Sequence, residues 1–316
     1  MIRELFKSTR KPHVIIVLGK GGVGKTTTAL LLGSELSDAS RVLVVSLDPA
    51  KHLAKYVGDG ILRGEVELKS NLVVKQVDLE LELKKYVEKH ASWIEELLPS
   101  LRVFNIESAV DAIKYSPGIE EEVFLNVVSG LYESAGADYV VVDTPPTGVA
   151  LRTLYLPALY MIWLDKLIEV RERIVALRYS ISRALGRAHE IRDAALEKLY
   201  ELKKKYSDLW SSLRDKNSTS YVLVCTPEPL PVYELSEAAR FLREKIGVKP
   251  SLVVVNKYLP KHIASEMGVL EAQEEYVEEL KAHGAPLLVV EYLGRPTKSF
   301  EDIAELKEKL RVVQSV

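Results

Sequence analysis

The chain has 316 residues, 47% of them hydrophobic, which is enough for one large core or two smaller ones. Its 43 basic and 45 acidic residues give a net charge of −2, which excludes bulk electrostatic attraction to nucleic acid or anionic lipid. The single cysteine, Cys225, excludes an intrachain disulfide and a multi-cysteine metal site within one chain. The longest apolar run, residues 154–164, is too short to span a membrane, so we expect a soluble, cytoplasmic protein.

Seven short apolar runs, separated by helix-length amphipathic segments, are predicted to be strands. They are residues 13–18, 41–46, 72–77, 139–143, 221–225, 252–255 and 287–291. Most are nearly all apolar, so helices should cover both faces of the sheet. This pattern predicts an α/β fold of three layers around a mostly parallel central sheet.

Two segments are longer than a crossover helix needs. The first, residues 79–116, has a helical pattern and ends at Pro117-Gly118. The second lies between the fourth and fifth strands, where apolar residues three and four apart predict a helical hairpin over about residues 150–215, turning near Gly186. We therefore expect one domain over residues 1–316 that carries an inserted helical subdomain.

The strongest motif is a glycine-rich loop, residues 19–27, directly after the first strand and directly before an apolar helical segment. Glycines let backbone N–H groups wrap phosphates, and the following helix presents its positive end to them. We predict that Lys25 reaches the β- and γ-phosphates and that the Thr26 hydroxyl ligates Mg²⁺. The predicted nucleotide-binding residues are Gly21, Gly22, Val23, Gly24, Lys25, Thr26 and Thr27.

Acidic residues follow the second strand and end the fourth. Asp48 is predicted to orient the attacking water and to lie beside Mg²⁺, although an aspartate there could instead cap a helix. Asp143 is predicted to hold Mg²⁺ through water, as the acid ending a Walker B strand does. The residues after each acid are predicted to report nucleotide state, namely Pro49, Ala50, Thr144, Pro145, Pro146, Thr147 and Gly148.

An additional lysine, Lys20, stands early in the glycine-rich loop, which therefore resembles the deviant Walker A of SIMIBI-class NTPases. With the motifs around Asp48, Glu120 and Asp143, nearly the whole chain resembles the ArsA/GET ATPases, which comprise arsenite-pump ATPases and targeting factors for tail-anchored membrane proteins. The resemblance implies a P-loop NTPase that uses ATP and Mg²⁺. It also implies a homodimer in which Lys20 acts in catalysis, beside Lys25 and Asp48, by reaching the partner's nucleotide.

The resemblance also assigns residues late in the chain and shows departures. Asn256 matches the adenine-contacting asparagine, and Pro286 begins the stretch that completes the base pocket. Against the family pattern, Lys51 precedes His52 in the first switch, and Val149 replaces a histidine in the second. The zinc-bridging Cys-x-x-Cys and the arsenite-binding cysteines are absent, so we expect no structural zinc and disfavour the pump branch.

The expected function is therefore an ATP-hydrolysing, dimeric targeting factor that binds transmembrane segments of tail-anchored proteins and delivers them to the membrane. A membrane receptor is a further candidate partner. Residues 154–185 hold more apolar side chains than one helix stripe needs, although these side chains could instead be the hairpin's own core. The candidate client-binding residues are Leu159, Ile162, Trp163, Leu167 and Ile174.

Two alternatives remain, an arsenite-type pump ATPase and a ParA/MinD-like partitioning ATPase. Membrane-binding members of the second class carry a basic C-terminal amphipathic helix. Here an apolar stripe from Phe300 to Val313 has a mixed charged face, which suits packing on the core. No nucleic-acid partner is expected.

Overall fold

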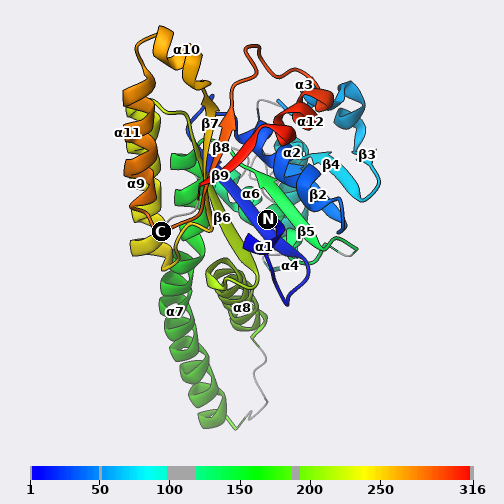
Figure 1. The fold of residues 1–316 in the computed structure, drawn as a ribbon. Helices are drawn as coiled ribbons and strands as arrows, with labels where there is room; N and C mark the ends of the chain where they lie inside the picture. The colour runs from blue at the N-terminus through cyan, green and yellow to red at the C-terminus, as the bar shows by residue number, and fades with distance from the viewer. Residues whose placement is uncertain (1, 50–51, 98–117, 135, 187–192, 314–316) are drawn as a thin grey trace.

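The computed structural model describes every residue except 1, 50–51, 98–117, 135, 187–192 and 314–316. Within that part of the chain, nine strands form one sheet in the order β3-β4-β2-β5-β1-β6-β7-β8-β9 (Figure 1). The seven predicted strands are all present, as β1 (His13–Gly19), β2 (Val42–Ser46), β4 (Leu72–Gln76), β5 (Tyr139–Asp143), β6 (Thr219–Cys225), β7 (Leu252–Tyr258) and β8 (Leu287–Glu291). They pair in parallel, which confirms the α/β prediction.

The sequence did not predict the two edge strands. β3 (Glu65–Lys69) pairs antiparallel with β4, and β9 (Leu310–Val313) pairs antiparallel with β8. The expected helical stripe to Val313 is therefore wrong beyond α12 (Phe300–Glu308). The last apolar residues leave the helix because their backbone groups pair with the open edge of β8.

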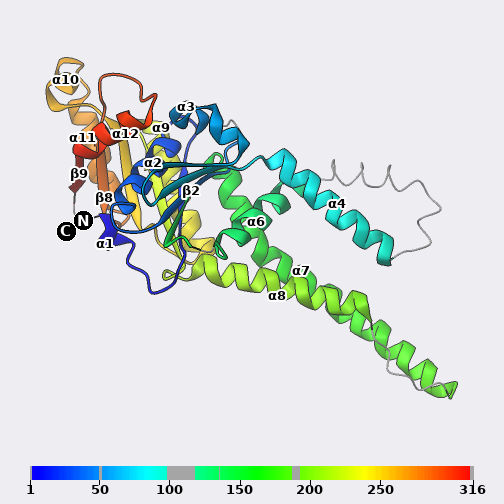
Figure 2. The same cartoon turned by 90° about the vertical axis from the view of Figure 1, so that its right-hand side faces the viewer.

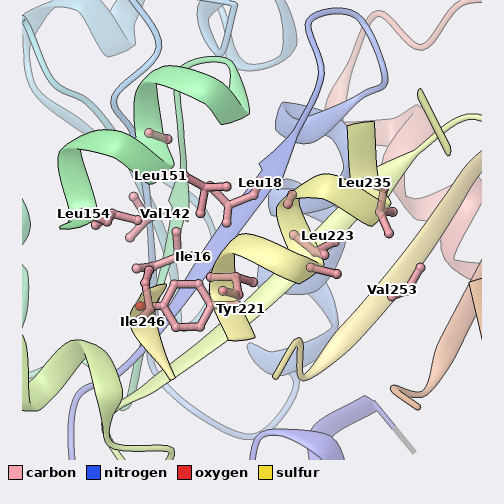
Figure 3. Close-up of a cluster of buried hydrophobic side chains, with 14 of the residues drawn as sticks. Ile16, Leu18, Val142, Leu151, Leu154, Tyr221, Leu223, Leu235, Ile246 and Val253 are labelled. Carbon is pink, nitrogen blue, oxygen red and sulfur yellow. The ribbon is translucent and has the colours of Figure 1, made fainter. Parts of the chain in front are cut away.

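Helices cover both faces of the sheet. α1 (Ile2–Leu5), α2 (Lys25–Leu36) and α12 pack on one face, where Ile15 and Val17 of β1 belong to the core. α6 (Ile119–Leu131), α7 (Thr147–Ala184), α8 (Ala194–Arg214), α9 (Pro229–Phe241) and α11 (Leu270–Lys281) supply the other side. There Ile16 and Leu18 of β1 belong to the core cluster shown in Figure 3. Alternate strand residues thus serve two cores, which gives the predicted three layers.

Short elements complete the chain near the edges of the sheet. α3 (Ala54–Val57) and η1 (Asp59–Arg63) lie between β2 and β3, and α10 (Lys261–Glu266) lies between β7 and α11. The helix α9 continues into a π-helical turn, η3 (Leu242–Ile246).

The helical insertions are present in the described residues. α4 (Leu79–Leu97) forms the first part of the 79–116 insertion, whose remainder lies outside the described residues. α7 and α8 form an antiparallel hairpin that projects away from the sheet (Figure 2). α7 has 38 residues, or roughly 57 Å, and continues through the buried Pro157. Gly186, near the predicted turn, has a φ of +67°, in the region that favours glycine.

A buried polar cluster fixes the base of this hairpin to α6. The Tyr206 hydroxyl of α8 donates a hydrogen bond of 2.6 Å to the Glu122 carboxylate of α6. The Tyr206 ring packs against Tyr160 of α7 with centroids 4.9 Å apart. Three helices therefore meet in one network, which holds the hairpin in a defined direction.

Candidate functional site

The glycine-rich loop connects β1 to α2 at the carboxyl edge of the sheet. Gly22 and Gly24 have φ values of +84° and +96°, which side chains other than glycine rarely adopt. A Cβ atom on Gly24 would lie 2.1 Å from the Asn256 Nδ2 atom. The loop therefore keeps its shape only with glycine at position 24, and it leads directly into the N-terminus of α2.

The start of α2 and the end of β5 meet in a buried polar group. The Thr26 hydroxyl donates a hydrogen bond of 2.8 Å to Asp143 Oδ2, and the Ser46 hydroxyl donates one of 3.0 Å to the same oxygen. Burial raises the pKa of Asp143 to about 6, although these two hydrogen bonds oppose the shift. Burial also lowers the pKa of Lys25, against the attraction of Asp143 and Asp48. Three ionisable groups thus share one desolvated corner.

This corner fits the Mg²⁺ ion that the family resemblance implies. Asp143 Oδ1 and Thr147 Oγ1 are buried without a hydrogen-bond partner, as expected of groups that accept one from a bound ligand or its water. The Thr26 hydroxyl and the Asp143 carboxylate are the groups that would hold the ion, directly and through water. Oxygen donors of this kind suit Mg²⁺, and the bound ion would neutralise phosphate charge.

Asp48 lies just beyond β2 with its side chain largely buried. Its Oδ2 atom is 3.4 Å from His52 Nδ1, so the insertion of Lys51 does not stop the histidine from reaching the aspartate. Leu53, and not Asp48, is the N-cap of α3. Asp48 lines the pocket, where the sequence predicts a water-orienting carboxylate. Pro49 follows it, and Ala50 lies outside the described residues.

A residue that sequence reasoning missed supports Asp48. The Gln76 amide, at the end of β4, donates to the carbonyls of Ser46 and Asp48 at 3.3 and 3.2 Å. The sequence signal that could have identified Gln76 is its position, since it is a polar residue at the end of an apolar strand. The structure buries it at the end of β4, which pairs with β2. Gln76 therefore ties the first switch to the neighbouring strand.

The second switch leads directly from Asp143 into α7. The Thr144 hydroxyl donates a hydrogen bond of 2.7 Å to the Val17 carbonyl of β1, which fixes the start of the loop. Pro145 and Pro146 make the turn, and Pro146 is both the N-cap of α7 and part of the pocket wall. Thr147 and Gly148 are already the first residues of α7.

Asn256 and its neighbour Lys257 hold the glycine-rich loop from the side of β7. The Asn256 Nδ2 atom donates to the Val23 carbonyl at 2.7 Å, and the Lys257 ammonium donates to the Gly22 carbonyl at 2.9 Å. Lys257 does this with a φ of +58°, an uncommon conformation for a residue with a side chain. Lys257 was not predicted. The sequence signal for it was its position beside Asn256 at a strand end.

Pro286 does not lie with these residues. It precedes β8, and its carbonyl accepts a hydrogen bond of 2.9 Å from Val253, near the start of β7. The loop after β8 lines the pocket instead, through residues such as Tyr292 and Arg295. The physical reason is that ligands of a parallel sheet lie at its carboxyl edge, and Pro286 is at the amino edge.

These parts enclose a cavity of about 820 Å³, large enough for a nucleotide. It brings together residues from the glycine-rich loop, both switches and the ends of β7 and β8. Among the predicted residues the lining includes Gly21, Gly22, Gly24, Lys25, Thr26, Thr27, Asp48, Pro146 and Asn256. Further lining residues that were not predicted include His52, Lys55, Tyr56, Lys257, Glu291 and Tyr292.

Lys20 is not among the residues that line this cavity. Its ammonium is 3.0 Å from the Glu234 carboxylate of α9, in a partly exposed ion pair. Such pairs contribute about 0–1 kcal/mol, so little free energy holds the lysine there. Lys20 can reach a second nucleotide only after leaving Glu234.

The candidate client-binding residues lie along α7, apart from the nucleotide site. All five are exposed, namely Leu159, Ile162, Trp163, Leu167 and Ile174. Leu167 and Ile174 line a groove that α7 forms with α8, whereas the buried core residues of α7 include Leu164 and Ile168.

Comparison with known proteins identifies the family of the chain. Residues 12–310 match the family described as anion-transporting ATPase. A protein of Aquifex aeolicus (strain VF5), provisionally named arsenical pump-driving ATPase 2, is 29% identical over 92% of this chain and 97% of its own length. ATPase get3 of Aspergillus terreus (strain NIH 2624 / FGSC A1156) is 29% identical over 89% of this chain and 86% of its own. ATPase GET3A of Arabidopsis thaliana is 28% identical over 95% and 90%. The chain therefore belongs to the anion-transporting (ArsA) ATPase family and is an ATPase.

Proposed function

We propose that this ATPase works as a homodimeric targeting factor that binds the transmembrane helices of tail-anchored proteins on α7 and delivers them to a membrane. The observation that carries the proposal is the apolar surface of α7, which no part of the described chain covers. The similarity to proteins named ATPase get3 and ATPase GET3A supports it at the level of the family.

The exposed side chains of α7 are large and close together. Trp163 is 70% exposed and Ile162 is 64% exposed. Among the described residues α7 is the one helix long and apolar enough to cross a membrane, yet only 33% of its most apolar stretch is buried. A core helix of this composition would be mostly buried, so the exposed face suits a hydrophobic partner. An apolar helix lying in the groove beside α8 would bury this face.

α7 also connects the apolar surface to the nucleotide site. It begins four residues after Asp143, and its first turns are anchored because Leu151 and Leu154 are buried against Ile16 and Val142 (Figure 3). A change in the loop at residues 144–146 therefore moves one end of a continuous helix. Nucleotide state and client binding would be coupled through this rigid element.

The residues of the site have distinct roles in the proposed cycle. Lys25 neutralises phosphate charge in every nucleotide state, because it is already held inside the pocket. Asp48 orients the attacking water from the first switch. Lys20 leaves Glu234 and reaches the partner's nucleotide when two chains close. Hydrolysis would then depend on the closed dimer.

Arsenite pumping is the less favoured alternative. Capture of As(III) needs several thiolates, and the chain has one cysteine, Cys225. That thiol is fully buried in the core, where burial raises its pKa to about 12. A thiol in this state does not supply a thiolate to a soft cation.

A ParA/MinD-like partitioning ATPase is also disfavoured. The helix that would have to bind a membrane is α12, and its Ile303 and Leu306 are buried in the core that α2 shares. β9 then holds the segment after it in the sheet. The C-terminal region is thus part of the fold.

Co-expression with the hydrophobic segment of a tail-anchored protein tests the proposal. In lipid-free buffer the two should co-elute as a complex containing two copies of the ATPase. Trp163→Asp and Ile174→Asp should each weaken capture, whereas Leu62→Asp, an exposed apolar position on η1, should not. If both α7 variants fold, hydrolyse ATP and capture the segment as tightly as the parent, α7 is not the binding surface.

A further inference from the structure

The distal segment of α7, residues 173–185, differs from the part of the helix nearer the sheet. The acidic residues of α7 are Asp165, Glu169 and Glu172, and all precede this segment. From residue 173 to residue 185 the sequence has three arginines and no aspartate or glutamate. The far end of α7 is therefore basic, in a chain whose net charge is −2.

The same segment exposes an apolar face. Leu177 is 64% exposed, Leu185 is 66% exposed, and Ile181 lies between them at the same four-residue spacing. Side chains four apart lie on the same face of a helix, so the three form one stripe. Other side chains of α7 contact the α8 end of the hairpin, for example Arg171, whose guanidinium lies 2.9 Å from the Asp193 carboxylate.

Two arginines of the segment flank this stripe by helical spacing, Arg173 four residues before Leu177 and Arg178 three residues before Ile181, and Arg183 lies on the opposite, polar face. Arg173, Arg178 and Arg183 are all exposed. Arg173 lies 2.6 Å from Glu169 in an exposed ion pair that exchanges partners at little cost. Arg178 lies 3.7 Å from the buried Asp193 carboxylate, which Arg171 already contacts at 2.9 Å, so Arg178 is the weaker partner of that acid. Long arginine side chains can lie along an apolar surface while the guanidinium reaches a polar one. The segment thus combines the two features of a helix that lies in a membrane interface.

We propose that the distal segment of α7 docks on an anionic lipid surface. Leu177, Ile181 and Leu185 would enter the boundary between headgroups and acyl chains, and the arginines would contact the lipid phosphates. Charge favours this occupant over a second copy of the chain, because two such segments would bring six arginines together without a compensating acid in either segment. Of the candidate client-binding residues, Ile174 lies at the start of this segment and the other four lie nearer the sheet.

The length of α7 makes this contact compatible with ATP turnover. Ile181 lies 34 residues beyond Thr147 on a continuous helix, or roughly 51 Å from the second switch. Figure 2 shows the end of the hairpin well clear of the sheet. A membrane can therefore meet the distal segment and leave the nucleotide pocket open.

Sedimentation of the full chain with lipid vesicles tests the proposal. One set of vesicles contains about 30% phosphatidylglycerol in phosphatidylcholine, and the other contains phosphatidylcholine alone. The protein should bind the anionic set, lose binding as salt is raised, and bind the zwitterionic set much more weakly. The triple change Arg173→Gln, Arg178→Gln and Arg183→Gln should weaken binding by about 100-fold, from the usual contribution of one arginine near a lipid surface.

A matched variant controls for total charge. Arg240→Gln, Arg243→Gln and Lys245→Gln remove three exposed charges from α9 and η3 and should leave binding unchanged. Leu177→Ser with Ile181→Ser should also weaken binding, with ATPase activity and lipid-free capture of an apolar helix retained. Equal effects of the two charge variants, or equal binding to both kinds of vesicle, would overturn the proposal. An absence of vesicle binding by the parent protein would also overturn the proposal, because the face would then not be a lipid site. This holds whether or not Leu177→Ser with Ile181→Ser changes the oligomeric state.

Discussion

Asp143→Asn should make the nucleotide-free protein more stable while it impairs the nucleotide site. Burial raises the pKa of Asp143 from 3.8 to about 6, so ionising this group costs the folded state about 3 kcal/mol relative to the unfolded chain. Asparagine has nearly the same shape, and its oxygen can still accept the hydrogen bonds from Thr26 and Ser46. The variant should therefore gain up to about 3 kcal/mol of stability at pH 8.

The pH dependence has a definite sign. The raised pKa means that the folded state keeps a proton that the unfolded chain loses, so this contribution is full below about pH 4 and is lost as the pH rises through about 6. The wild type should therefore lose stability relative to the variant over this window. The gap between them should be largest above pH 7 and should fall to roughly half by pH 5.

Urea unfolding with EDTA present, followed by circular dichroism from pH 5 to pH 8, measures this difference. Repeating the unfolding with Mg²⁺ and ATP adds a functional readout. Ligand binding should stabilise the wild type and should stabilise the variant much less. A variant that is less stable than the wild type at pH 8, or a gap that does not change with pH, would refute the reasoning.

Four further substitutions test the site. Lys25→Ala should abolish nucleotide binding in a filter assay, whereas Lys20→Ala should leave binding by the monomer intact and lower turnover; equal loss of affinity would exclude the cross-dimer role. Asp48→Asn should bind ATP normally and hydrolyse it about 100-fold more slowly in a single-turnover assay, and turnover at the wild-type rate would remove Asp48 from the reaction. Gly24→Ala should lower ATP affinity at least about 10-fold, because its Cβ would displace Asn256 and the φ of +96° is strained; affinity within twofold of the wild type would contradict the loop geometry.

Local sequence patterns were sufficient for the central sheet. Runs such as residues 139–143 are apolar on both faces, and only a strand between two helical layers satisfies that composition. The two edge strands of the sheet were harder to predict. In β3 the residues alternate Glu65, Val66, Glu67, and in β9 Leu310 and Val313 continue the helical spacing of α12. Short edge strands carry little periodicity, and their pairing partner decides their structure.

The features of the site also divide into those that the sequence predicts and those that only the structure shows. The glycine-rich loop and the two acids at strand ends could be predicted because each is local in sequence and has a chemical reason at a fixed spacing. The ion pair between Lys20 and Glu234 and the support that Gln76 gives to Asp48 join distant segments, so no spacing encodes them. Pro286 was predicted to begin the stretch that completes the base pocket, but it lies at the amino edge of the sheet. A resemblance at one position does not fix which edge of the sheet a residue occupies.

Photocrosslinking from α7 most directly tests whether α7 receives the hydrophobic helix. A photoreactive phenylalanine analogue placed at Ile162 or Trp163, both strongly exposed, should crosslink to a co-purified tail-anchored segment. The same probe at Leu62, exposed on η1, should not. Crosslinking from α7 alone is the predicted result. A segment that co-purifies but crosslinks from Leu62, or from neither α7 position, would contradict the account.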